Sequence, residues 1–302
     1  MKRKLVKQGT STMMVSLPSK WIKSNGLDKG SEVDIEEKEN QIVISGKPTG
    51  TKKELKISVK GFSQTAIRSM ITNAYRLSYG KVDIEFGTAQ EFNIITETLR
   101  KSLIGFEIVS RTDKECTIEN ITEPGQEHSG NVFLKLLYNI DELIDAVKKM
   151  MKGSAEIQYI KEIEENIQRY DNFCRRTAHN AKNPVLLTAY YKEIVQAQRE
   201  IYMIAIYLEK KKIRLSSQTM NQYESLAKYF GNIKDAYMKN DLSLAEKAHK
   251  MEKELIYDKG YTLLRTKKGE ESIIIFRILT ATRMFYLSLS PFIGLLLDNP
   301  VY

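Results

Sequence analysis

The sequence predicts a multi-domain α+β protein of three parts: an N-terminal β domain over residues 1–47, a middle α/β domain over 54–122 and an all-α C-terminal domain over 130–302. Three patterns support this division. Short alternating strands surround tight turns in the first part, strands and helical segments alternate in the second, and long helical segments fill the third. With 302 residues, the chain is long enough for several cores.

The N-terminal part reads as two short hairpins on either side of a short helix. Pro18 suits the first turn of that helix and Gly26 its end. The expected elements are strands at 5–7 and 13–17 around a turn at 9–12, a helix at 19–24, and strands at 32–36 and 41–44. So small a unit exposes apolar strand surface, and we therefore expect it to dimerise to build its core.

Residues 47–53 are expected to be a linker, and a βαβαββ unit follows them. Its expected strands are 54–59, 82–86, 106–111 and 116–121, and its expected helices are 64–77 and 89–103. The segment Gly61-Phe-Ser-Gln-Thr lies between a strand and a helix. A helix N-terminus can bind an anion, but Ser and Thr at that place are also common helix caps, and the sequence does not decide between the two.

Residues 123–130 mark the next boundary, and about six helices of 20–28 residues are expected after it. Breaks are expected at 153–154, 183–184, 216–217, 240–241 and 268–269. The helical part also repeats itself: Asp145-Ala146 matches Asp235-Ala236, and Ala197-Gln-Arg-Glu-Ile-Tyr lines up with Ala281-Thr-Arg-Met-Phe-Tyr. Two three-helix units, each too thin to bury its own apolar faces, should pack as one bundle.

Composition points to a soluble protein of a reducing compartment. Cys116 and Cys174 match no metal or redox spacing and are expected to be reduced, which suits the cytoplasm. The N-terminus is basic but lacks the apolar stretch of a secretory signal. The uncharged run from Met284 to Leu297 is shorter than the roughly 20 residues that span a bilayer, and we expect a buried helix there and no membrane insertion.

Charge is concentrated at the N-terminus. The chain has a formal net charge of +9, and its first 27 residues contain six Lys or Arg and no acid. A compact cationic surface of this kind is typical of proteins that bind phosphate backbones. The residues expected to contact DNA phosphates are Lys2, Arg3, Lys4 and Lys7, with hydrogen bonds from Thr10, Ser11 and Thr12 and further charge from Lys20 and Lys23. The alternative is a merely solvated basic surface.

Three stretches of this segment resemble the AbrB/SpoVT swapped-hairpin DNA-binding domains: Lys4-Leu-Val-Lys-Gln-Gly-Thr-Ser-Thr, Val15-Ser-Leu-Pro-Ser-Lys-Trp-Ile and Gly26-Leu-Asp-Lys-Gly-Ser-Glu-Val. The resemblance covers nearly all of that fold. It implies an intertwined homodimer whose basic strands and loop lie on DNA. Many members have Gly-Asp where this chain has Gly30-Ser31, a departure expected to weaken one contact that caps the turn.

The helical segment is similar to PhoU, which is built from two three-helix repeats. The stretches that carry this resemblance are Lys239-Asn-Asp-Leu-Ser-Leu-Ala-Glu-Lys-Ala and Ile163-Glu-Glu-Asn-Ile-Gln-Arg-Tyr-Asp-Asn-Phe-Cys-Arg-Arg. The order of the three parts resembles a group of archaeal phosphate uptake regulators. PhoU proteins hold metal ions in Glu-x-x-x-Asp clusters, where this chain has Val195 with Arg199 and Leu279 with Arg283. We therefore expect no metal site, because a guanidinium does not bind cations.

Arg199 and Arg283 occupy matching positions on two apolar helices. Either each pairs with a nearby acid or caps a helix end, or the two form an interior anion-binding pocket, since paired guanidiniums suit phosphate geometry. The isolated histidines His128, His179 and His249 are not expected to bind metal. Asp171 and Glu165 lack a partner nucleophile, so we expect no enzyme and no cofactor.

The sequence as a whole predicts a cytoplasmic homodimeric transcription regulator that binds double-stranded DNA. By resemblance to PhoU, its helical part would respond to phosphate or another small anion, or dock a transporter or kinase component, in the control of phosphate uptake. One alternative is an interaction protein that regulates a phosphate transporter or signalling kinase without binding DNA. Another is an antitoxin, because the same N-terminal fold serves in antitoxins.

Overall fold

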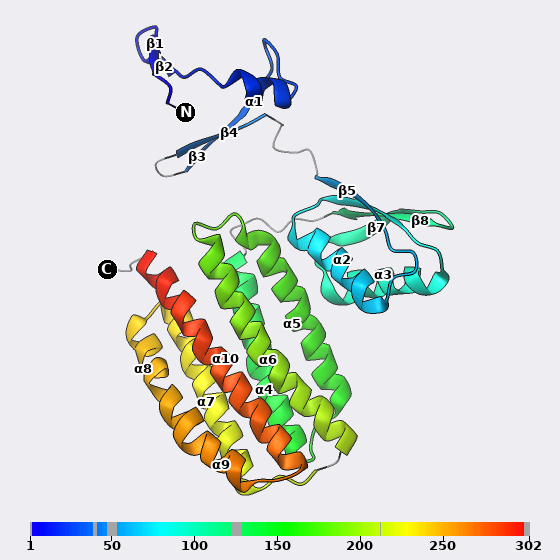
Figure 1. Cartoon of the computed structure of the whole chain (residues 1–302), viewed down its shortest axis with the longest axis vertical. Coiled ribbons are helices and arrows are strands. Elements are labelled where there is room, and N and C mark those ends of the chain that lie inside the picture. Colours follow the sequence, from blue (N-terminus) through cyan, green and yellow to red (C-terminus); the bar gives the residue numbers. More distant parts are fainter. Residues whose placement is uncertain (1, 39–40, 47–52, 122–128, 212, 299–302) are drawn as a thin grey trace. The chain divides into compact units, whose positions relative to one another are not determined.

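The computed structural model describes residues 2–38, 41–46, 53–121, 129–211 and 213–298 of the chain (Figure 1). Most of the predicted linker (residues 47–52) and of the predicted boundary segment (residues 123–128, including His128) lies outside the described residues. The chain divides into two compact units, Met1–Lys53 and Glu54–Tyr302. The predicted three-part architecture is confirmed at the level of small N-terminal strands, a middle sheet and a C-terminal helical region.

The N-terminal unit consists of two separate hairpins and one short helix. Strand β1 (Val6–Gln8) pairs antiparallel with β2 (Thr12–Met14), and β3 (Asp34–Lys38) pairs antiparallel with β4 (Gln41–Ser45). Helix α1 (Ser19–Ser24) follows Pro18 and ends at Asn25, and Gly26 has a φ of 64°. The expected order of elements is therefore present, although the two hairpins form two separate sheets within one chain.

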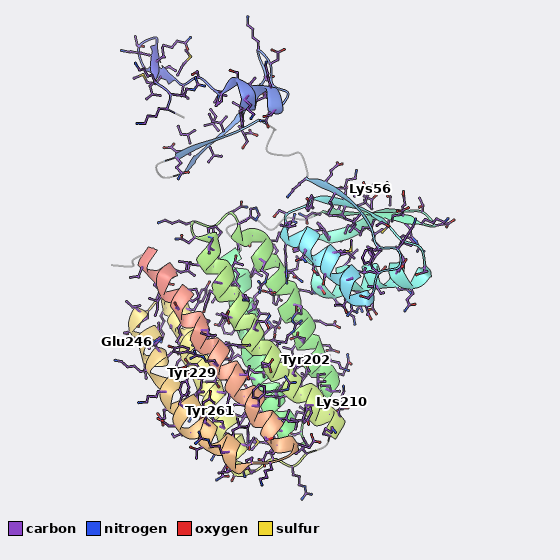
Figure 2. The ribbon with its side chains drawn as sticks, in the orientation of Figure 1. Lys56, Tyr202, Lys210, Tyr229, Glu246 and Tyr261 are labelled. Atoms are coloured by element: carbon purple, nitrogen blue, oxygen red, sulfur yellow. The ribbon has the colours of Figure 1, made fainter. Side chains whose placement is uncertain are left out.

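The second unit begins with a four-stranded sheet in the order β5-β6-β8-β7. Its strands are β5 (Glu54–Ser58), β6 (Lys81–Glu85), β7 (Phe106–Arg111) and β8 (Glu115–Asn120), and only β5 and β6 are paired in parallel. Helices α2 (Gln64–Arg76) and α3 (Ala89–Ser102) cover one face of the sheet (Figure 1). The other face is polar and carries Lys56 (Figure 2), which pairs with Glu115 at 3.7 Å.

The turn before α2 is closed by the chain's own side chains. Ser63 caps the helix by accepting a hydrogen bond from the Ala66 N–H, as expected of a capping residue. The N–H of Gly61, where φ is 72°, donates to Glu91 Oε1 at 2.7 Å. Glu91 accepts further bonds from the N–H groups of Gly87 and Thr88, and these backbone donors hold its pKa below the ordinary value. An internal carboxylate therefore takes the position in which an external anion was considered.

The remainder of the second unit is a helical bundle. Its long helices are α4 (Ser129–Met151), α5 (Ile157–Ala178), α6 (Pro184–Lys211), α7 (Ser217–Lys239) and α10 (Glu270–Asp298). A single fifth helix was expected between α7 and α10, but this stretch is α8 (Leu242–Glu252), a π-helical segment η2 (Lys253–Gly260) and α9 (Tyr261–Thr266). At Gly260, a Cβ atom would lie 2.7 Å from the backbone oxygen of Leu255 and would also meet Leu279 of α10, so the position where η2 meets α10 favours glycine.

The sequence repeat corresponds to a repeat of helices. Asp145 lies in α4 and Asp235 in α7, and the two later matching stretches begin at Ala197 in α6 and Ala281 in α10. One continuous core joins the helices, with the buried rings of Phe133, Tyr190, Tyr223, Phe230 and Phe285 among its members. A single shared core is what two thin three-helix units were expected to form.

Helix α10 supplies much of this core. Ile274, Ile278, Phe285 and Leu289 are fully buried on its inner face. Among the described residues, Glu270–Leu297 is long and apolar enough to cross a membrane, yet half of its most apolar window is buried in the bundle. Burial against the rest of the bundle agrees with the expected core helix, but part of its outer face remains exposed.

Sheet and bundle belong to one unit because polar side chains join them. Arg176 of α5 is 5% exposed, and its Nη1 donates to the backbone oxygens of Tyr75 at 2.7 Å and Tyr79 at 3.0 Å. Arg76 of α2 donates to Asp171 at 3.2 Å and to Asn172 at 2.8 Å. These contacts connect residues about a hundred positions apart and form the junction between α2 and α5.

Candidate nucleic-acid interface

The β1–β2 hairpin presents the basic N-terminal segment. Val6 pairs with Met14 and Lys7 with Met13, and residues 9–11 form the turn between the strands. Gly9 has a φ of 75°, a left-handed conformation that glycine adopts without steric cost. Thr10, Ser11 and Thr12 lie in this turn and at the start of β2, with every side chain exposed. Small hydroxyl residues in such a turn let backbone N–H groups approach a phosphate closely.

The residues predicted to contact DNA are all exposed in the N-terminal unit, namely Lys2, Arg3, Lys4, Lys7, Thr10, Ser11, Thr12, Lys20 and Lys23. Lys2 to Lys7 lie before and in β1, whereas Lys20 and Lys23 lie on α1, which has no buried residue. Within the described part of the chain, none of the six cations forms an ion pair. Their charge is thus available to an external anion.

The turn after α1 keeps capping hydrogen bonds although this chain has Gly30-Ser31 where Gly-Asp is common in the resembling domains. Gly30 has a φ of 89°, and the Ser31 hydroxyl accepts a hydrogen bond from the Asp28 N–H at 2.9 Å. The Lys29 N–H also donates to Asp28 Oδ1 at 2.8 Å. Ser31 itself therefore provides a capping contact, and the turn holds the end of α1 close to the start of the second hairpin.

The same unit exposes an apolar surface. On the β3–β4 hairpin, Ile35 pairs with Ile44, and Ile42 lies on the same face because it is two residues from Ile44. Ile35 is 65% and Ile42 67% exposed, and Leu5, Met13 and Val15 of the first hairpin are also exposed. Among residues 2–35, 37, 41–46 and 53, none is buried. A single copy of this unit therefore lacks a core.

A comparison with known families gives a match to this unit. Residues 6–54 match the family model described as antidote-toxin recognition MazE, bacterial antitoxin. The match covers about a sixth of the chain, and it supports the predicted N-terminal swapped-hairpin domain. Neither the curated proteins nor the solved structures contain a significant match to the chain.

The matched kind of domain explains both the charge and the exposed apolar face. MazE/AbrB-type domains bind DNA and dimerise, which is consistent with double-stranded DNA and a second copy of the chain as partners. Such a domain fits a DNA-binding regulator or an antitoxin-type role. The exposed isoleucines would then be covered by the other copy, and the exposed cations would face the phosphates.

Arg199 and Arg283, for which an ion pair and an interior anion pocket were the two alternatives, both lie at the surface of the bundle. Arg199 is exposed on α6, within electrostatic range of Glu164 and Asp171. The Arg283 side chain is 43% exposed and donates to Glu252 of α8. Of the two alternatives for these arginines, Arg283 follows the first, an ion pair with a nearby acid, and the exposure of both side chains gives no support to the second, an interior anion pocket.

For the second unit, the sequence predicts the absence of a metal site. The described residues contain no group of three or more His, Cys, Asp and Glu placed to hold a metal ion. Val195 and Leu279 are buried core residues. Sequence reasoning missed the arginines of the α2–α5 junction, since no local pattern marks a contact between residues so far apart in the chain.

Proposed function

We propose that the protein is a DNA-binding transcription regulator whose paired N-terminal units bind the duplex through phosphate contacts. The observation that carries the proposal is a set of six exposed, unpaired cations, of which Lys7, Lys20 and Lys23 lie within residues 6–54, the part that matches a MazE-type family model, and the other three directly precede it. Cations without internal partners attract the phosphates of any duplex, and contacts to base edges would add sequence preference. Lys2, Arg3, Lys4 and Lys7 contact phosphates, Thr10, Ser11 and Thr12 donate hydrogen bonds, and Lys20 and Lys23 extend the surface.

The helical part is the sensor or docking module in this proposal. Its likeness to PhoU is the support for a link to phosphate uptake, and the residues that carry this likeness are those of α5 and α8. A ligand regulates DNA binding only if it favours one arrangement of the chain over another. An expected consequence is that phosphate, or another small anion, alters the affinity for the chain's own promoter.

The test is the salt dependence of DNA binding by the full chain carrying Lys4→Glu and Lys7→Glu. If each lysine contacts one phosphate in each copy of a dimer, four contacts are lost. The slope of log K against log salt should then become shallower by about 3 to 4, and affinity should fall by more than about tenfold. Fluorescence anisotropy with a labelled promoter duplex measures both quantities.

The matched control is Lys210→Glu with Lys247→Glu, two exposed lysines of the second unit. This variant has the same change in net charge but should keep the slope of the unaltered chain. Equal slopes for both variants would show that the N-terminal cations do not contact phosphates. If the unaltered chain dimerises without shifting DNA, the non-DNA-binding interaction protein becomes the better account.

An antitoxin is the second candidate, favoured by the description of the matched family model. In that case the chain would form a stable complex with a toxin protein. Antitoxins of this fold are expected to carry a short disordered tail, whereas residues 54–302 contain two hydrophobic cores. Native mass spectrometry of the chain purified from its own cells separates the two, because a regulator is recovered as a homodimer and an antitoxin with a second polypeptide.

A further inference from the structure

The outer face of α10 is apolar although it is exposed. Helices on the surface of globular proteins normally direct polar residues outward, and a helix that is apolar all round is normally covered. On α10, however, Ile273 is 39%, Phe276 58%, Leu287 42% and Leu297 65% exposed. No charged residue occurs between Met284 and Leu297. An exposed apolar row of this length on a core helix indicates that another surface covers it.

The exposed positions follow a regular spacing of three and four residues. Between the four large side chains stand three small residues and one arginine, which gives the row Ile273, Phe276, Thr280, Arg283, Leu287, Ser290, Gly294 and Leu297. This 3.5-residue period is that of two helices packed along their length in a coiled coil. We refer to these eight positions as the α10 seam. Arg283 is neutralised by Glu252 and can contribute its aliphatic stem to the seam.

The seam is complementary to itself under a twofold axis that reverses the helix. With the axis near Phe285, Ile273 faces Leu297 of a second copy, Phe276 faces Gly294, Thr280 faces Ser290 and Arg283 faces Leu287. Phe276, the largest side chain of the seam, thus lies opposite Gly294, which has no side chain. The twofold axis repeats this contact at the other end of the helix pair. A Cβ added at Gly294 would lie 2.9 Å from Leu186 Cδ1 of α6, so the Leu186 side chain borders this position. A partner's Phe276 ring would therefore rest on an apolar floor.

We propose that the α10 seam is a contact between two copies of this chain, with the two α10 helices packed antiparallel. A twofold contact uses the same patch on both copies, which explains why large and small residues of one helix are arranged symmetrically. The proposed pairing of N-terminal units supplies a second copy at high local concentration, so a modest seam suffices. Only this tethering argument rests on the proposed function.

Cross-linking through introduced cysteines tests the pairing in the full chain. Both native cysteines, Cys116 and Cys174, are buried, and burial raises the pKa of the Cys116 thiol to about 11. The double variant Thr280→Cys with Ser290→Cys places thiols directly opposite each other across the twofold axis. A short bis-maleimide should convert most of this variant into a covalent dimer, which denaturing gel electrophoresis detects.

The two single variants are the matched controls. In antiparallel helices, position 280 of one copy lies about 15 Å along the axis from position 280 of the other, since a helix rises 1.5 Å per residue. Thr280→Cys alone and Ser290→Cys alone should therefore give little dimer. Equal cross-linking by single and double variants would mean parallel or unspecific contact and would overturn the proposal, as would no cross-linking of the double variant.

A further pair of variants connects the cross-link to the seam. Phe276→Glu in the double-cysteine chain should lower the yield at least about tenfold, because it buries a carboxylate against an apolar floor. Phe62→Glu, at a similarly exposed phenylalanine of the middle sheet region, should leave the yield unchanged. Circular dichroism confirms that both fold. If the unaltered chain instead co-floats with phosphatidylglycerol vesicles and the double-cysteine variant does not cross-link, the seam binds lipid and the proposal is wrong.

Discussion

The N-terminal unit and the rest of the chain differ in whether one copy of the chain buries their apolar side chains. Residues 2–35, 37, 41–46 and 53 of the first unit include no buried side chain, whereas the second unit has a core under its sheet and another through its bundle. The difference follows from the elements available. Two separate hairpins and a six-residue helix cannot enclose apolar side chains, whereas long helices and a four-stranded sheet can. We therefore expect the apolar side chains of the first unit to be covered by a second copy.

This difference also separates two kinds of charged residue. In the N-terminal unit the cations are exposed and without acidic partners in the described residues, so an external anion can bind them. In the second unit, Arg76, Arg175 and Arg176 are engaged with a carboxylate, an amide or backbone oxygens. Arginines of the second kind hold the sheet against the bundle and contribute to folding.

The largest effect is expected from a change to the apolar face of the first unit. Ile35→Asp with Ile42→Asp should prevent pairing of two N-terminal units, because the buried interface would contain four carboxylates. DNA affinity should fall by about 100-fold or more, since binding by two linked units is lost. Anisotropy with the promoter duplex measures this loss.

The control for this change is Val109→Asp, a similarly exposed position in β7. It should leave DNA affinity intact. The helical signal in circular dichroism should be the same for all three proteins, because residues 54–302 have their own cores. A loss of helical signal in the Ile35/Ile42 variant would contradict this expectation, because it would show that folding of the second unit depends on the first.

An intermediate effect is expected at the α2–α5 junction. Arg176→Met removes the donor to the Tyr75 and Tyr79 oxygens and should lower the free energy of unfolding by about 3 kcal/mol. Arg68→Met removes only an exposed pair with Glu97, and it should cost about 1 kcal/mol or less. Urea denaturation measures both. Similar costs for the two variants would mean that the junction contributes little to the second unit.

The smallest effect concerns the pH dependence of the second unit. Burial raises the pKa of Glu164 above its ordinary value, although hydrogen bonds from Gln168 and Gln198 act in the opposite direction. A carboxyl group with a raised pKa takes up a proton on folding, and its contribution to stability is lost as pH rises from the unfolded pKa through the folded one. Glu164→Gln should remove this decrease in stability with rising pH. Thermal unfolding midpoints, measured at pH values from below the unfolded pKa to above the folded one, test this.

Glu91 supplies the control of opposite sign. Its pKa is lowered by the N–H groups of Gly87 and Gly61, so its contribution is present above the unfolded pKa and is lost as pH falls through the folded pKa. Glu91→Gln should therefore flatten the acid side of the profile, whereas Glu164→Gln flattens the side above it. A profile that neither variant changes would show that other groups control stability in this range.

Periodicity predicted nearly every element, with bounds that differ by one or two residues for α2, α3 and the strands of the sheet. It failed between α7 and α10, where a π-helical segment interrupts an expected single helix, because the close approach of Leu279 to Gly260 is not visible in a local pattern. The cations of the N-terminal unit were identifiable from their density alone. The positions of Arg199 and Arg283 were not, since burial depends on which helix faces each residue.

The sequence by itself determined the order of strands and helices, the acid-free cationic segment and the repeat of the bundle, because each depends on patterns that can be recognised along the chain. Only the tertiary structure decided that Glu91 occupies the anion position at Gly61, that Arg176 joins α5 to the sheet region and that one row of α10 remains exposed. These features depend on contacts between residues 30 to 101 positions apart, or on which faces of a helix its neighbours cover. Such contacts form only when the cores do, and local propensity carries no information about them.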